Sequence, residues 1–259
     1  MSDIKLINIK DKENYSKGKI NKVNMQKIIE ENCFELLGLQ LIDSNYNIQS
    51  HPGEIIESIG IDENYQLAII EYRQGKFSQT INKGLFFVDY INNHLSEFKL
   101  LVVDKLGQEL AKQVTYKPRL ICIGDDFNHY DEYAINQLPL DIDLIKFQSF
   151  TRGFVVIEKG VCGRRQIRVR EESFKNSIKE KELLEEIRKF VLSLGDEVVE
   201  SDFGLFLSYR RIKNFMYITN EEGITIKLKL HDKYRSYVIN TLGDFNRSKT
   251  NIESAYDQN

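Results

Sequence analysis

The sequence predicts a first domain of the α/β class, with a mixed sheet flanked by helices, followed by a small α+β domain. Three observations indicate this. Two isoleucine-rich runs flank a polar turn at 62–65, which is typical of a β-hairpin. An apolar strand, a helix and a second strand then follow one another between 118 and 147, as in a βαβ unit. A glycine- and arginine-rich stretch at 160–170 separates this block from a second one.

Composition limits the kinds of protein this chain can be. Its 259 residues can form one large domain or two small ones, and 41% hydrophobic with 29% charged residues is typical of a soluble globular protein. A net charge of −3 means that any basic surface must be local. The three cysteines and four histidines are scattered, which argues against a disulfide framework or a zinc site. With no apolar run of bilayer length and no signal-like start, we expect a cytoplasmic protein that does not span a membrane.

The first block opens with a lysine-rich stretch and a short strand expected within Ile4–Ile9. Apolar residues then recur at helical spacing from Met25 to Leu37. Asn24 is the expected N-cap of this helix, and Gly38 is expected to end it. A strand over Leu39–Asp43 leads toward the hairpin. The lysines are interpreted as a solvated face, with a phosphate-attracting edge as the alternative.

Each strand of the predicted hairpin carries one glutamate in an apolar run, Glu57 in the first and Glu71 in the second. A carboxylate is rarely buried unless it is paired or binds a cation. Two carboxylates on neighbouring strands can together hold a hard divalent ion. On spacing alone, the favoured interpretation is simpler: both side chains point to solvent from the polar face of the hairpin.

The rest of the first domain alternates helices and strands. A helix is expected over Gln79–Leu95, and a buried strand over Arg119–Gly124. A second helix should end near Leu138 and be followed by strands over Ile142–Phe147 and Thr151–Glu158. We therefore place the first domain at 1–159.

The second domain is expected at 178–259, after a glycine- and arginine-rich linker at 160–177. It begins with a helix over 178–194, and a hairpin follows with alternating strands between 215 and 230.

Two basic groups are candidates for binding nucleic acid. In the linker, four arginines within seven residues, with no acid among them, can bind phosphates, or can simply keep a linker soluble. In the second domain, cations beside aromatic residues can combine charge with stacking, or can protect an edge strand from aggregation. The candidate residues are Arg164, Arg165, Arg168, Arg170, Arg210, Arg211 and Lys213.

Several segments carry a resemblance to a known family. Gly60–Asn64, Ile69–Tyr72 and Lys83–Phe87, together with 118–132, resemble the PD-(D/E)XK nuclease superfamily, in particular its NucS-like group. The resemblance extends over about the first 150–160 residues, the size of one domain, and implies a restriction-endonuclease-like fold. The segments 194–196, 209–215 and 252–256 resemble a small domain of unknown function found after nuclease-like domains in bacterial proteins.

The resemblance implies a DNA endonuclease that uses Mg²⁺ or Mn²⁺. It implies metal ligation by Glu57 and Glu71, with Glu30 added from the first helix. The chain departs from the family pattern at three places, because Glu57 replaces an Asp, Arg73 a Lys and Lys83 a Gln. The implied catalytic set is therefore Glu57, Glu71, Arg73 and Lys83, with Lys83 supplying the missing lysine from the helix after the hairpin.

Two alternatives to an active nuclease remain open. The altered residues are also compatible with a catalytically decayed nuclease-fold module that binds DNA, or with a protein-interaction subunit. DNA is the expected partner, and a homodimer is left open.

Overall fold

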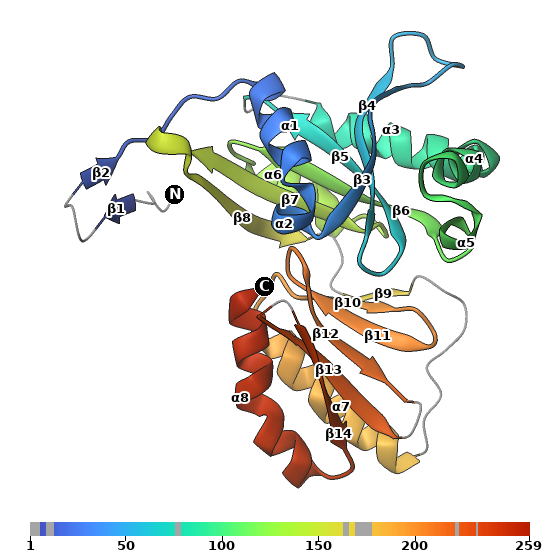
Figure 1. Cartoon of the computed structure of the whole chain (residues 1–259), viewed down its shortest axis with the longest axis vertical. Coiled ribbons are helices and arrows are strands. Elements are labelled where there is room, and N and C mark those ends of the chain that lie inside the picture. Colours follow the sequence, from blue (N-terminus) through green and yellow to red (C-terminus); the bar gives the residue numbers. More distant parts are fainter. Residues whose placement is uncertain are drawn as a thin grey trace.

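The computed structural model describes residues 6–8, 13–75, 79–162, 166–168, 178–220, 223–231 and 233–259. Within these ranges the chain forms two domains, each with a six-stranded sheet and its own helices (Figure 1). A separate ribbon precedes them, in which β1 (Leu6–Asn8) pairs with β2 (Glu13–Tyr15). None of the helices in these ranges combines the length and apolar character that crossing a membrane requires.

The first sheet has the strand order β3-β4-β5-β6-β7-β8. Its strands are β3 (Leu39–Asn47), β4 (Ile55–Asp62), β5 (Gln66–Arg73), β6 (Thr115–Gly124), β7 (Ile142–Ser149) and β8 (Val155–Cys162). Strands β5, β6 and β7 run parallel, and the other neighbours are antiparallel. Helix α6 (His129–Asn136) connects β6 with β7, so the predicted hairpin, βαβ unit and mixed sheet are confirmed.

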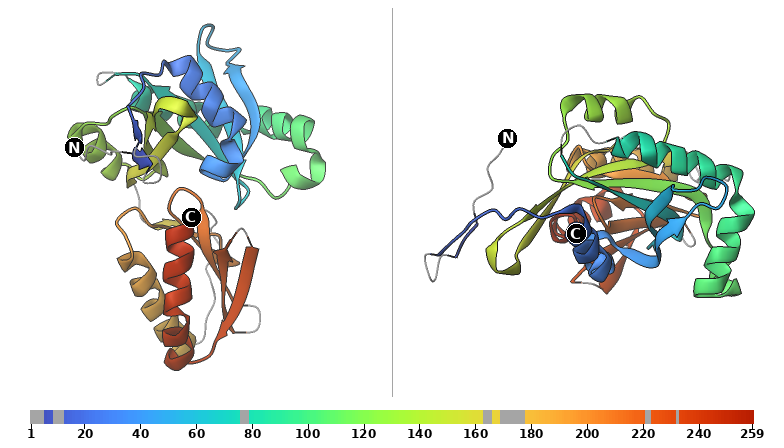
Figure 2. Two further views of the ribbon diagram at one scale, coloured as in Figure 1. Left: turned by 60° about the vertical axis from the view of Figure 1, so that its left-hand side comes forward. Right: turned by 90° about the horizontal axis from the view of Figure 1, so that it is seen from above.

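Helices cover both faces of this sheet (Figure 2). The helices are α1 (Lys22–Glu31), α2 (Cys33–Leu37), α3 (Thr80–Asn93), α4 (Leu95–Leu106) and α5 (Gln108–Ala111), besides α6 and the short η1 (Thr151–Gly153). Successive strand residues point to opposite faces. Ile69 accordingly joins the core beneath α3 and α4, whereas Ile70 joins the core beneath α1 and α2.

The first helix begins earlier than predicted. Its N-cap is Asn21, whose side chain accepts a hydrogen bond from the Asn24 backbone N–H at 2.8 Å, so the assignment of Asn24 as the cap is wrong. A break at Asn32 divides the expected single helix into α1 and α2. Gly38 ends α2 as predicted, with a left-handed φ of 66° that glycine adopts without steric cost.

The second sheet has the order β14-β13-β12-β11-β10-β9. Its strands are β9 (Gln166–Arg168), β10 (Val199–Asp202), β11 (Phe206–Arg210), β12 (Asn214–Thr219), β13 (Ile224–Leu230) and β14 (Lys233–Ile239), and its helices are α7 (Ile178–Ser193) and α8 (Leu242–Gln258). Both helices pack on one face of the sheet through a single apolar core. The predicted small α+β domain with a hairpin of β12 and β13 is confirmed.

The segment expected to be a linker, 160–177, is structured at its beginning. Strand β8 of the first sheet continues to Cys162, and β9 pairs in parallel with β10 of the second sheet. The chain therefore passes from one sheet to the other within a few residues, and the residues between β9 and α7 lie outside the described ranges.

A buried cluster of charged side chains joins the two domains. Asp143 on β7 accepts from Arg119 Nη2 at 2.6 Å and from Arg210 Nη1 of the second domain at 2.7 Å. Lys159 Nζ lies 2.8 Å from its other oxygen. Arg210 also pairs with Asp141. Burial alone would raise the pKa of Asp143, but Arg210, Lys159 and Arg119 together hold it well below its usual range.

Candidate active site

Glu57 and Glu71 lie together at the end of the hairpin that is farthest from its turn. The ladder between β4 and β5 reaches Ser58 and Ile70 and ends there, one residue before the two glutamates. Both side chains are buried, with Glu57 6% and Glu71 1% exposed. The interpretation that both point to solvent is therefore wrong.

The two carboxylates replace the hydrogen bonds that a continued ladder would make. The Tyr72 backbone N–H donates to Glu57 Oε2 at 2.8 Å, and the Glu57 backbone N–H donates to Glu71 Oε1 at 3.2 Å. One oxygen of each glutamate is thereby fixed by the backbone. Glu57 Oε1 and Glu71 Oε2 remain to interact with other groups.

Lys83 on α3 reaches these two oxygens. Its Nζ lies 3.4 Å from Glu57 Oε1 and 3.3 Å from Glu71 Oε2, and donates to the Ile55 backbone carbonyl at 3.1 Å. The ammonium also lies 5.1 Å from the centre of the Phe87 ring. The predicted meeting of Glu57, Glu71 and Lys83 is thus present, with one positive charge among three oxygens.

Sequence reasoning did not assign Lys22 to this site. Lys22, the first residue of α1, pairs with Glu57 Oε1. It belongs to the lysine-rich stretch that the sequence pattern favours as a solvated face. The helical spacing contains a signal that could have found it: Lys22, Gln26 and Glu30 are four residues apart and therefore share one helix face. Gln26 also reaches β4, donating to the Glu57 backbone carbonyl at 3.1 Å.

Burial and charge change the acid–base properties of the site. Burial is the largest cause raising the pKa of Glu71 to about 7, with repulsion from Glu57 added and Lys83 opposing. Burial on its own would lower the pKa of Lys83, but the carboxylates of Glu71 and Glu57 outweigh it and raise that pKa. Glu71 can therefore take up or release a proton near neutral pH, while Lys83 stays charged.

Glu30 does not join the two glutamates of the hairpin. Its Oε1 accepts from Ser58 Oγ at 2.6 Å and from Gln26 Nε2 at 2.9 Å. Ser58 Oγ in turn lies 3.1 Å from Tyr72 OH, on the α1 side of the sheet. The structure thus shows Glu30 bonded to Ser58 and Gln26 rather than to the Lys83 ammonium, and its part in a metal site stays a prediction.

The donor set suits a hard divalent cation in its chemistry. Two carboxylate oxygens and one backbone carbonyl surround the Lys83 ammonium, and Mg²⁺ commonly binds through one or two carboxylates while keeping several waters. Over the described ranges, the structure contains no group of three or more His, Cys, Asp or Glu side chains placed for a metal. With two carboxylates as its protein ligands, the site fits an ion that is held by Glu57 and Glu71 and takes the place of the Lys83 ammonium.

Arg73 points to a different partner. Its Nη1 donates to Asp131 Oδ2 at 2.5 Å, its Nε donates to the Gly75 carbonyl at 2.9 Å, and its guanidinium lies 5.1 Å from the Phe127 ring. A Cβ on Gly124 would come within 2.8 Å of Arg73 Cβ, so the neighbouring strand leaves room for the arginine by carrying glycine. The structure brings Arg73 to α6 rather than to the Lys83 ammonium.

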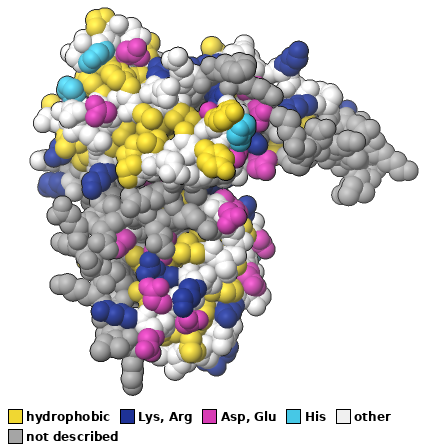
Figure 3. Space-filling model, turned by 180° about the vertical axis from the view of Figure 1, so that it is seen from behind, with side chains coloured by type: hydrophobic (Ala, Val, Ile, Leu, Met, Phe, Trp, Pro, Cys, Tyr) yellow, Lys and Arg dark blue, Asp and Glu magenta, His cyan; other side chains and the backbone are white. Residues whose placement is uncertain are grey.

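Among the arginines expected to bind nucleic acid, the structure describes the side chains of Arg210 and Arg211. Arg210 is 1% exposed, and Asp141 and Asp143 bind its guanidinium, so its assignment to a binding surface is wrong. Arg164, Arg165 and Arg170 lie outside the described residues, and only the backbone of Arg168 is described, in β9. Figure 3 shows side chains of both charges interleaved over the rear face of the second domain.

Arg211 and Lys213 line a groove of about 490 Å³ between the domains. Acidic side chains, including Glu35 and Glu197, share its wall. Arg211 Nε lies 3.1 Å from Glu197, and the guanidinium covers the Tyr256 ring at 4.5 Å. The strand that precedes them, β11, lies inside the sheet between β10 and β12, so protection of an edge strand does not explain these cations.

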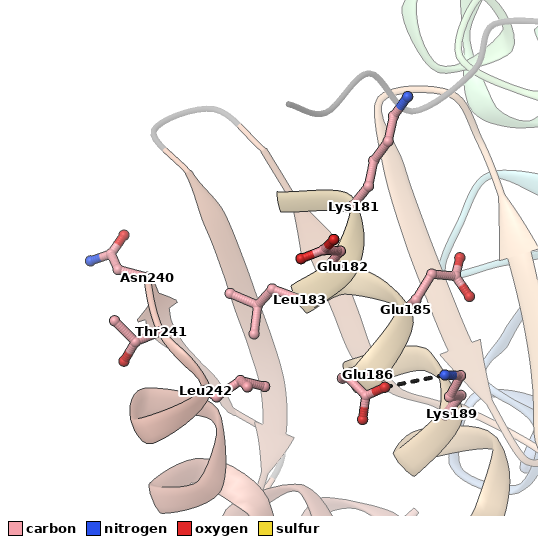
Figure 4. Close-up of a pocket in the computed structure, with 9 residues that line it drawn as sticks. All are labelled: Lys181, Glu182, Leu183, Glu185, Glu186, Lys189, Asn240, Thr241 and Leu242. Carbon is pink, nitrogen blue, oxygen red and sulfur yellow. Dashed lines mark hydrogen bonds and ion pairs between the residues drawn. The ribbon is translucent and has the colours of Figure 1, made fainter. Parts of the chain in front are cut away.

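A further groove of about 710 Å³ lies in the second domain, between α7 and the residues that lead into α8 (Figure 4). Lys181 and Lys189 flank Glu182, Glu185 and Glu186 along α7, and Lys189 pairs with Glu186 at 3.1 Å. Charges of both signs thus line this wall, and none of the predicted site residues lies here.

Comparison with known proteins identifies no family. No family model matches the chain, and no curated protein matches it. Among solved structures, a complex of EndoMS with double-stranded DNA matches at 14% identity and a TM-score of 0.30, covering 52% of this chain and 48% of that one. A repair endonuclease from Pyrococcus abyssi matches at 14% identity and a TM-score of 0.30, covering 51% and 49%. The chain spans about half the length of these two matched chains.

Proposed function

We propose that the chain is a metal-dependent nuclease that hydrolyses DNA at the site formed by Glu57, Glu71 and Lys83. One observation carries this proposal: two buried carboxylates at the end of a hairpin ladder each direct one oxygen to a single point, where a lysine supplies positive charge. Buried paired carboxylates are costly unless a cation compensates them, which favours a functional site. DNA as the substrate follows from the resemblance of the hairpin to the PD-(D/E)XK superfamily.

Glu57 and Glu71 would hold the ion. A bound Mg²⁺ or Mn²⁺ would polarise the phosphodiester and generate a nucleophilic hydroxide. Glu71, with a pKa near 7, must lose its proton to bind an ion, so ion binding releases protons below neutral pH. Lys83, displaced from between the carboxylates, can donate to a phosphate oxygen and stabilise negative charge that develops in the transition state.

A second candidate function is a nuclease-fold module that has lost catalysis and retains DNA binding. It is favoured by the charge balance of the site, because Lys22 and Lys83 already neutralise the two carboxylates. In that case the lysines replace the ion permanently and hold the strand ends together.

Mn²⁺ binding and cleavage together test the two candidates. Mn²⁺ binding is measured by electron paramagnetic resonance, and cleavage is measured on plasmid and branched DNA with Mg²⁺ or Mn²⁺. The nuclease predicts that wild type binds Mn²⁺ and cleaves, that Glu71→Gln loses both, and that Lys83→Ala loses about a hundredfold in cleavage rate while retaining Mn²⁺. Glu30→Gln is the matched control, since Glu30 on α1 accepts from Ser58 rather than from Lys83, and it should retain both.

The non-catalytic candidate predicts a different pattern. Wild type would bind DNA without cleaving it, and Mn²⁺ would not bind until Lys83 or Lys22 is removed. Cleavage that survives Glu71→Gln would contradict the nuclease proposal.

A further inference from the structure

A second groove between the domains, of about 630 Å³, lies at the other end of the β4–β5 hairpin from the glutamates. One wall is the turn of that hairpin, and the other is the face of the second sheet opposite α7 and α8. With a rise of about 3.3 Å per residue, the turn lies roughly 15–20 Å along β4 from Glu57. We define the aromatic groove by six of its lining residues: Tyr65, Lys112, Phe206, Tyr217, Lys227 and Tyr234.

The wall formed by the second sheet carries a row of rings. Phe206 on β11, Tyr217 on β12 and Tyr234 on β14 follow one another, with ring centres 5.7 and 5.4 Å apart. The residues on the opposite face of these strands belong to the core beneath α7 and α8. Tyr234 is 45% exposed, so a substantial aromatic surface remains open to a ligand.

The opposite wall carries Tyr65, which is 42% exposed and has a left-handed φ of 59°. Glycine or asparagine is usual at such a position, and a non-glycine residue there is strained. Backbone hydrogen bonds hold the conformation: the Tyr65 N–H donates to the Asp62 carbonyl at 2.9 Å, and the Thr115 N–H donates to the Tyr65 carbonyl at 2.7 Å. The backbone that carries this exposed ring is thus held in place, on the wall opposite the ring row.

Among the lining residues that the structure describes, the charge that remains for a ligand is positive. Glu63, the acid in the groove, is neutralised by Lys229 Nζ at 2.7 Å and accepts from the Asn214 backbone N–H at 3.1 Å. Lys227, which pairs in register with Tyr217, makes no salt bridge with any residue that the structure describes. Lys112 makes an exposed pair with Glu109 at 2.7 Å, of a kind that contributes little energy and can exchange partners.

We propose that the aromatic groove binds single-stranded nucleic acid. A base would insert between Tyr65 and the row of rings, and the adjoining phosphates would lie near Lys227 and Lys112. Aromatic platforms combined with cations bind single strands with little dependence on sequence, because every base has a face that stacks. The inference does not depend on the proposed nuclease activity, since the groove and the glutamates are at opposite ends of the hairpin.

The test measures strand binding without cleavage. A fluorescein-labelled thymidylate strand of about 12 nucleotides, within the site sizes of single-strand binding modules, is titrated with the full chain in EDTA by anisotropy. The variants are Tyr65→Asn, which tolerates the left-handed backbone, and Tyr234→Ser. The matched control is Tyr133→Ser on α6, a tyrosine that is 70% exposed.

Loss of one stacking partner should weaken binding about tenfold for Tyr65→Asn and for Tyr234→Ser, and leave Tyr133→Ser unchanged. Lys227→Gln should reduce the slope of log affinity against log salt by about 0.7. Circular dichroism checks that each variant is folded.

Photo-crosslinking with a strand containing 5-iodouracil gives a readout that does not depend on affinity. Cross-links to Tyr65, Phe206, Tyr217 or Tyr234, located by mass spectrometry, would support the proposal. The proposal would be overturned by a lack of binding by wild type, by affinities of Tyr65→Asn and Tyr234→Ser equal to that of wild type, or by cross-links confined to residues outside the groove. Tight binding of free thymidine monophosphate with no gain from a strand would also overturn it.

Discussion

At the scale of single residues, burial of two like charges sets the behaviour of the candidate active site. Glu71 is held by the Glu57 backbone and by Lys83, yet its pKa is raised from 4.5 to about 7 because burial and Glu57 outweigh these contacts. A raised carboxyl pKa means that the folded state holds the proton more tightly than the unfolded state does. Glu71 therefore favours folding below about pH 4.5, and this contribution is lost as pH rises to about 7.

The first prediction follows from the upward shift of the Glu71 pKa. In the metal-free protein, Glu71→Gln should match wild type in stability near pH 4.5 and exceed it by on the order of 3 kcal/mol above pH 7. Urea unfolding of both proteins across this range measures the difference. A difference that does not change with pH would show that Glu71 titrates normally.

The second prediction concerns Arg73, which sequence reasoning assigned to catalysis. A lysine at this position cannot donate at once to Asp131 and to the Gly75 carbonyl, and it loses the planar contact with Phe127. Arg73→Lys should therefore cost about 1–3 kcal/mol of stability and should not raise cleavage. Thermal unfolding and the cleavage assay measure the two effects, and an activated variant of unchanged stability would contradict this role.

At the scale of secondary-structure elements, the position of α3 determines whether Lys83 reaches the two glutamates. Gly84, the next residue, packs directly on β6: a Cβ there would lie 2.5 Å from Leu120 Cδ1 and 2.7 Å from Cδ2. Leu120 is buried in the core between α3 and the sheet. Gly84 thus permits the close contact between α3 and β6 that positions Lys83 near the two glutamates.

The third prediction uses this contact. Gly84→Ala should destabilise the protein by about 1–3 kcal/mol through overpacking, and it should move Lys83 away from the carboxylates. Combining it with Leu120→Val, which removes a methylene, should recover part of the stability. Urea unfolding of the two single variants and the double variant measures the coupling. Additive effects would mean that the two residues do not compete for the same space.

Elements with strong local signals were predictable, and contacts between distant elements were not. The hairpin is predictable because a polar turn that begins at Asp62 separates two apolar runs. In the structure the Asp62 carboxylate stabilises this turn by accepting from the backbone N–H groups of Asn64 and Gln66 at 2.8 and 2.9 Å. Glu57 and Glu71 were found through family resemblance, since spacing alone favoured solvent. The pairing of Arg210 with Asp143 was not predictable, because its two residues are 67 positions apart in different domains.

At the scale of the whole molecule, the buried cluster around Asp143 couples the two domains. Three acids, Asp62, Asp141 and Asp143, face three cations, Arg119, Lys159 and Arg210, so formal charge balances within the interface. Because the pKa of Asp143 is depressed, its contribution to stability is fully present above its unfolded value of 3.8 and is lost only as pH falls further. The domains should therefore remain coupled throughout the neutral range.

The last prediction tests this coupling. Arg210→Ala leaves Asp141 and Asp143 with too little positive charge in a buried site, and breaking a buried pair in this way typically costs about 3–5 kcal/mol. Arg211→Ala is the matched control, because its partly exposed pair with Glu197 should contribute about 1 kcal/mol or less. Urea unfolding of Arg210→Ala should separate into two transitions, one for each core, whereas wild type and Arg211→Ala should unfold together. A single transition with an unchanged midpoint in Arg210→Ala would mean that the domains are held together by the other contacts across the interface, such as that between Glu63 and Lys229.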